Sequence, residues 1–149
     1  MKIYVCSSWR NEHFASLLRD LRDAGHQVWD WRNPPTGGSG FRWQDAGCIG
    51  YRHGDKIPVD VLRDMLAHPV AQAGFASDLC SMTWCDVGVL LHPCGRSAHL
   101  EAGWIAGRGK PVHMLSPADL EPDLMVLALG GKIFSSIPGL LAELERRHG

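Results

Sequence analysis

The sequence has little net charge, no long apolar run and no pairing pattern among its cysteines. Its 149 residues carry a net charge of −1, which excludes the broad positive field that attracts nucleic-acid polymers or anionic membranes. No apolar run approaches the ~20 residues needed to cross a bilayer, and the polar Ser7 and Ser8 interrupt the first apolar run too early for a secretory signal. The five cysteines contain no C-x-x-C pair, so neither a disulfide framework nor a zinc site is indicated. We therefore expect a cytoplasmic protein with no metal or other cofactor and no membrane or nucleic-acid partner.

Two familiar motifs are also missing, and one possible metal-binding pair is weak. The glycine-rich segment at 37–40 is not followed by Lys-Ser or Lys-Thr, as a P-loop would be. Ser97 does not stand in a G-x-S-x-G segment, which argues against a hydrolase nucleophile elbow. Cys94 and His99 lie close in sequence, but one such pair is weak evidence for a metal ion.

Short apolar runs alternate with helical patterns along the whole chain. Strands are predicted over 3–6, 28–31, 87–91, 111–115 and 133–134, and helices over 14–21, 58–66, 70–84, 119–129 and 137–147, with a further helix opening near Ser97. The first three elements form a β-α-β unit, which favours a parallel sheet with right-handed connections. We predict a single domain over 1–149 of the α/β class: a three-layer sandwich around a roughly five-stranded parallel sheet, flavodoxin-like or Rossmann-like in plan.

The predicted strand over 87–91 and the helix after it contain the first candidate site residue. Ser97 is expected to cap this helix, which places Glu101 at the end of the first turn, one position beyond the acid of a capping box. Because open α/β sheets bind ligands at the carboxyl ends of their strands, Glu101 is a candidate nucleophile. The alternative is a surface glutamate stabilised by the helix dipole.

Two turns combine serine with arginine: Ser7 to Arg10 after the first strand, and Arg96-Ser97 after the strand over 87–91. An arginine at a helix amino terminus is opposed by the helix dipole, so a bound phosphate or carboxylate would explain both turns. The alternative is a pair of solvated arginines.

Asp78 and Asp86 are candidates for a second carboxyl group. A carboxyl near Glu101 would have its pKa raised by repulsion and could donate a proton, and two carboxyls with different tasks are usual in glycosidic cleavage. For Asp86 the alternative is a structural acid ahead of a strand. The long loop over 34–54 contains Trp43, which could stack on a planar ligand or only hold the loop to the core.

In four segments, taken in order, the sequence resembles the nucleoside 2-deoxyribosyltransferases and their nucleotide N-glycosidase relatives. These segments are 2–5 with 8–10, 75–79, 85–87, and 101–112. The resemblance implies that Glu101 is the nucleophile that attacks the anomeric carbon, that Asp78 contacts and protonates the base, and that Tyr4 lies close to the nucleophile. It also implies that Ser8 and Arg10 hold a 5′-phosphate.

Two departures from the family favour glycosidic cleavage over base exchange. Gly95 stands where the transferases often carry an aspartate, and the carboxy-terminal asparagine segment that a neighbouring subunit lends to their site is not found. We expect an enzyme that breaks the N-glycosidic bond of a nucleoside or its 5′-monophosphate, by hydrolysis or transfer, in a homo-oligomer. The expected substrate-binding residues are Ser8, Trp9, Arg10, Trp43, Asp86, Gly95, Arg96 and Ser97. The alternatives are a non-catalytic nucleotide sensor and cleavage of the nicotinamide–ribose bond of NAD.

Overall fold

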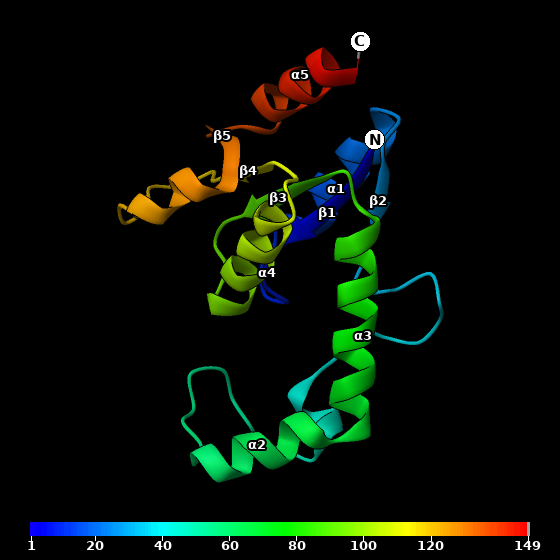
Figure 1. The fold of residues 1–149 in the computed structure, drawn as a ribbon, viewed down its shortest axis with the longest axis vertical. Coiled ribbons are helices and arrows are strands. Elements are labelled where there is room, and N and C mark those ends of the chain that lie inside the picture. Colours follow the sequence, from blue (N-terminus) through cyan, green and yellow to red (C-terminus); the bar gives the residue numbers. More distant parts are fainter. Residues whose placement is uncertain (149) are drawn as a thin grey trace. The chain divides into compact units, whose positions relative to one another are not determined.

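The computed structural model describes residues 1–148 and contains a five-stranded parallel sheet (Figure 1). The strands are β1 (Lys2–Cys6), β2 (Gln27–Trp29), β3 (Val87–Leu91), β4 (Val112–Leu115) and β5 (Gly130–Phe134), in the order β2-β1-β3-β4-β5. All five residues of β3 are buried, as the unbroken apolar run from Val87 to Leu91 predicts for a central parallel strand. The flavodoxin-like strand order confirms the predicted fold class.

Five α-helices and two 3₁₀ turns connect and follow these strands. The helices are α1 (Phe14–Asp23), α2 (Val59–Ala67), α3 (Pro69–Trp84), α4 (Arg96–Gly107) and α5 (Ile137–His148), and the 3₁₀ turns are η1 (Trp43–Ala46) and η2 (Leu124–Leu129). None of these helices is long and apolar enough to cross a membrane.

The helix predicted over 119–129 is wrong: its first half is not helical, and its second half forms only the 3₁₀ turn η2. Pro122 has no amide hydrogen to donate and disfavours helical geometry at the residue before it. The side chain of Asp123 then accepts a hydrogen bond from the Met125 amide (2.9 Å) and starts the shorter η2 turn instead.

The connections divide the helices between the two faces of the sheet. The step from β1 to β2 runs in one direction along the sheet and the step from β3 to β4 in the other, so right-handed crossovers place α1 and α4 on opposite faces. Helix α1 contacts α5, which packs against β4 and β5, whereas α4 packs against β1, β3 and β4. The order reverses between β1 and β3, and such a switch point is where open α/β sheets bind ligands.

Strand β5 forms an edge with most of its residues exposed, and its backbone passes very close to β4. A Cβ atom at Gly131 would lie 2.1 Å from the carbonyl oxygen of Val112, so only glycine fits there. The exposed apolar side chains of this region are Leu124, Met125, Leu127 and Ile133.

The chain forms two compact units. The first contains Met1–Asp30 and the chain from Ser81 onward, with the whole sheet and α1, α4 and α5. The second is Trp31–Cys80, with η1, α2 and most of α3. The predicted single domain stays a prediction.

Candidate active site

The loops after β1 and β3, residues 7–11 and 92–96, meet at the switch point, and we call them the switch-point loops. The Ser7 hydroxyl donates to the Leu91 carbonyl oxygen (3.0 Å), and the Asn11 side-chain amide donates to the carbonyl oxygens of Leu91 (3.4 Å) and Pro93 (3.1 Å). Asn11 is buried, so these bonds are shielded from water. These hydrogen bonds hold the two loops together at the carboxyl ends of β1 and β3.

Helix α4 begins two residues earlier than the sequence suggests, and this moves Glu101 out of its first turn. Gly95 is the N-cap residue in an extended conformation (φ −97°, ψ −168°), no side chain caps the helix, and Ser97 is an exposed residue of its first turn. The predicted Ser97 cap is therefore wrong. Glu101 is the sixth residue of α4, beyond the first turn in which the helix dipole acts strongly on a charge.

Glu101 lies close to two thiol groups of the switch-point region. Burial raises the pKa of the Cys6 thiol, and the charge of Glu101 adds to this rise. Burial, and then the Glu101 charge, raise the pKa of Cys94 to about 11. Cys6 ends β1 and Cys94 follows β3, so the half-buried Glu101 carboxylate lies at the carboxyl ends of the two central strands.

Tyr4 is on the face of the sheet that α4 covers. It pairs in register with Gly88, where a Cβ atom would lie 3.4 Å from Ile105 Cδ1 of α4. Paired residues of neighbouring strands point to the same face, and so do residues two apart, so Tyr4 and Cys6 both face α4. Tyr4 therefore lies on the face of the sheet covered by α4, the helix that contains Glu101, and its closeness to Glu101 stays a prediction.

Both serine–arginine turns lie at the same edge of the sheet. The Ser8 hydroxyl accepts a hydrogen bond from the Arg10 amide (3.3 Å), and the side chains of Trp9 and Arg10 are exposed. Arg96 and Ser97 are also exposed, in the first turn of α4. Helix α1 begins only at Phe14, so the helix-dipole argument for an anion does not apply to Arg10, whereas it still applies to Arg96.

Asp86 lies at the opposite edge of the sheet, directly before β3. Its carboxylate accepts a hydrogen bond from the Lys2 amide (2.8 Å), and its own amide donates to the Lys2 carbonyl oxygen (2.8 Å). These bonds align the starts of β1 and β3, which supports the structural alternative for Asp86. The position of Asp86 therefore argues against a substrate-binding role.

The second unit places Asp78 in a cavity of about 430 Å³ between α3 and the loop that precedes η1. Burial raises the pKa of Asp78 to about 6. The pKa of Asp78 therefore rises for another reason than the one predicted: the cause is desolvation of the carboxylate rather than repulsion by a second acid. The cavity is lined by Trp31, Pro34, Thr36, Gly37, Ser39, Gly40, Phe41, Asp45, Val70, Ala73, Gly74, Ser77 and Asp78.

Phe41, rather than Trp43, is the aromatic side chain of this loop that lines the cavity. A Cβ atom at Gly74 would lie 2.7 Å from Phe41 Cβ, so the loop packs directly on a glycine of α3. Trp43 makes an edge contact with Phe41 (ring centroids 5.0 Å apart, planes at 82°). This contact fits the alternative in which Trp43 holds the loop in place.

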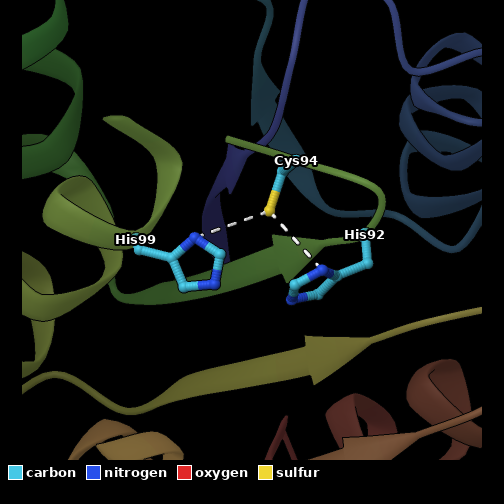
Figure 2. Close-up of side chains that lie close together, drawn as sticks. All are labelled: His92, Cys94 and His99. Carbon is cyan, nitrogen blue, oxygen red and sulfur yellow. Dashed lines mark hydrogen bonds between the residues drawn. The ribbon is translucent and has the colours of Figure 1, made fainter. Parts of the chain in front are cut away.

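A cluster of metal-type ligands lies in the second switch-point loop and the start of α4 (Figure 2). The Cys94 sulfur lies 3.8 Å from Nδ1 of His92 and 3.9 Å from Nδ1 of His99. In the sequence, the pair of Cys94 and His99 is weak evidence for a metal ion, and that pair does not include His92. The spacing His-x-Cys-x₄-His, across the end of a strand and the first turn of a helix, is the signal that could have found it.

Two solved structures share this architecture. A 2-deoxyribosyltransferase from Bacillus psychrosaccharolyticus superposes with a TM-score of 0.62 at 21% identity, over 95% of this chain and 90% of that one. The chain has the nucleoside 2-deoxyribosyltransferase fold. The CMP N-glycosidase BcmB from Clostridium botulinum superposes with a TM-score of 0.54 at 13% identity, over 97% of this chain and 99% of that one. No protein-family model and no curated protein sequence matches the chain.

The deoxyribosyltransferase fold confirms, at the level of architecture, the resemblance found in the sequence. Both neighbours are matched over nearly their whole length, so the two-unit organisation lies within the matched region.

Proposed function

We propose that this protein cleaves the N-glycosidic bond of a nucleoside or a nucleoside 5′-monophosphate. The observation that carries the proposal is the position of Glu101, a half-buried carboxylate beside the β1–β3 switch point. The fold supports it, because it is the fold of a 2-deoxyribosyltransferase and of a CMP N-glycosidase.

In the proposed reaction, the Glu101 carboxylate attacks C1′ of the sugar. The new C1′–O bond forms as the C1′–N bond breaks, and the bonding electron pair leaves with the base. We assign the proton that the base takes up to Asp78, whose pKa of about 6 keeps a fraction of it protonated near neutral pH. Water then hydrolyses the glycosyl ester, or a second base takes the sugar, and Glu101 is regenerated. We assign Tyr4 to positioning Glu101, since it faces the same helix.

Substrate recognition is assigned to the exposed polar groups of the switch-point loops and the first turn of α4. Ser8 and Arg10, with Arg96 and Ser97 from the second turn, would hold the phosphate or the 5′-hydroxyl. Trp9 would stack on the base, and Gly95 would leave its backbone accessible to the ligand.

We further propose a cytoplasmic homo-oligomer, a dimer or larger. All five cysteines are free in the structure, which fits a reducing compartment. The exposed apolar side chains around η2 and β5 support self-association, because such a patch is costly to leave in water. Sedimentation of the protein should give at least twice the chain mass of 16.4 kDa, and a monomer at micromolar concentration would reject this part of the proposal.

Release of free base, followed by chromatography, tests the reaction. The panel contains nucleosides, 2′-deoxynucleosides and their 5′-monophosphates, each with and without an acceptor base. Glu101→Gln should lower kcat by a factor on the order of 10³ or more while ligand binding persists. Glu145→Gln, an exposed glutamate of α5, is the matched control and should keep full activity.

The outcomes separate the proposal from its alternatives. Base release without an acceptor identifies a hydrolase, and release that requires one identifies a transferase. Saturable nucleotide binding without release of base identifies a sensor, and release of nicotinamide from NAD identifies a glycohydrolase. Full activity of the Glu101→Gln protein would exclude the glycosyl-enzyme mechanism.

A further inference from the structure

We propose that His92, Cys94 and His99 form a binding site for Zn²⁺ at the carboxyl end of β3. The three side chains converge from the second switch-point loop and the first turns of α4 (Figure 2). Each offers one ligand atom, and these three atoms all lie within 4.8 Å of one another. The site goes beyond the proposed glycosidic reaction and does not depend on it.

The spacing of the ligand atoms suits a tetrahedral zinc ion. With a Zn–S distance of about 2.3 Å and a Zn–N distance of about 2.0–2.1 Å, sulfur and nitrogen ligands of a tetrahedral ion lie about 3.6 Å apart. The Cys94 sulfur lies 3.8 Å and 3.9 Å from the Nδ1 atoms of His92 and His99. For these two sulfur–nitrogen pairs, movements of a few tenths of an ångström would therefore reach the tetrahedral spacing.

The contacts of the two histidines also bear on the site. His99 Nδ1 lies 2.8 Å from the Gly95 carbonyl oxygen, so coordination through this nitrogen would replace that hydrogen bond. Nε2 of His92 is buried and finds no hydrogen-bond partner among residues 1–148. A buried polar nitrogen without a partner costs about 1–3 kcal/mol, and coordination of His92 through Nε2 rather than Nδ1 would offset this cost.

The surroundings leave room for a fourth ligand. His92 and His99 line a cavity of about 440 Å³ together with Glu121 and Asp123. A water molecule could occupy the open position from this cavity, as at zinc sites with three protein ligands. The two carboxylates add negative charge where a divalent cation would enter.

The donor set selects the ion. A thiolate with two imidazoles is soft to borderline, so it disfavours Mg²⁺ and Ca²⁺, which take oxygen ligands. Binding would replace the thiol proton of Cys94 by the metal, and that proton passes to the solvent.

Titration of the metal-free protein with Co²⁺ tests the site, because a tetrahedral cobalt–thiolate complex absorbs in both the near ultraviolet and the visible. One equivalent should produce both bands, and Zn²⁺ should displace it and abolish them. Cys94→Ser should lose the near-ultraviolet thiolate band, and His99→Ala should weaken binding about 10-fold or more. Cys80→Ser, an exposed cysteine of α3, is the control and should behave as the unmodified protein.

The cobalt titration does not measure catalysis, so a negative result would leave the glycosidase proposal unaffected. Circular dichroism of each variant checks that the fold is retained, and the half-buried His99 gives a second variant if Cys94→Ser does not fold. The proposal is overturned if no thiolate band forms, if the band survives in Cys94→Ser, or if it is lost equally in Cys80→Ser.

Discussion

Replacement of Asp78 by asparagine should stabilise the protein at neutral pH and leave it unchanged in acid. Burial raises the pKa of Asp78 from 3.8 to about 6, so the folded state favours the neutral carboxyl. The stability linked to that neutral form is fully present below about pH 3.8 and is lost as the pH rises through about 6. Asparagine keeps the shape of the side chain and never ionises.

The size of the effect follows from the pKa. At ~1.4 kcal/mol per pKa unit, the rise corresponds to at most ~3 kcal/mol, and solvent in the open cavity reduces this to ~2 kcal/mol. Urea unfolding at a series of pH values from 4 to 8 should therefore give equal free energies for both proteins at pH 4. At pH 8 the Asp78→Asn protein should be ~2 kcal/mol more stable.

Asp64→Asn removes one exposed carboxylate from α2 and controls for the change in net charge. A stability difference between Asp78→Asn and the unmodified protein that is the same at pH 4 and pH 8 would refute the desolvation argument. So would a difference that grows toward acid.

Three further predictions concern other parts of the first unit. Arg10→Ala should raise KM for a 5′-monophosphate by about 10- to 100-fold, because a charged hydrogen bond to the phosphate is lost. KM for the free nucleoside should stay unchanged. Equal effects on both substrates would exclude a phosphate-binding role for Arg10. Gly131→Ala should lower the free energy of unfolding in urea by ~2 kcal/mol or more, since the new Cβ would lie 2.1 Å from the Val112 carbonyl oxygen. Gly103→Ala, in the open middle of α4, should raise it by up to ~1 kcal/mol. Similar values for the two variants would contradict the close approach of β5 to β4. Glu143→Gln should lower Tm at pH 7 and have less effect near pH 3. The Lys132 hydrogen bond holds the pKa of Glu143 below 4.5, and the stabilisation that this gives is lost as the pH falls through the lowered pKa. An equal loss of Tm at both pH values would contradict this explanation.

The sheet could be predicted because its strands are buried on both faces. The short apolar runs at 3–6, 87–91 and 111–115 are best removed from water as strands that are covered on both faces. Their alternation with helices indicates a parallel sheet. The switch point follows from the strand order, and with it the edge at which Glu101 would lie. What the runs cannot show is which acids lie near that end of the sheet. Asp86 directly precedes the run at 87–91, so it lies at the amino end of β3, whereas Glu101 comes from the helix after β3.

Helix starts were harder to predict, because several residues can cap the same turn. Ser97 is the better side-chain cap by type, yet Gly95 takes the N-cap position without any side-chain bond. Helix α4 therefore begins with Arg96, and Glu101 leaves the first turn. A shift of two residues in the cap therefore removes the helix-dipole argument for Glu101, whose charge instead adds to the raised pKa values of Cys6 and Cys94.

The cluster of His92, Cys94 and His99 shows a third limit, which is set by the turn between strand and helix. Along the sequence, His92 is the residue after a strand and His99 a residue of a helix, so no single periodicity places them on one side. The chain reverses between them, and their ring centroids lie 5.2 Å apart with Cys94 within reach of both. The same reversal brings Cys94 close to Glu101, so the β3–α4 connection supplies both the proposed nucleophile and the proposed zinc ligands.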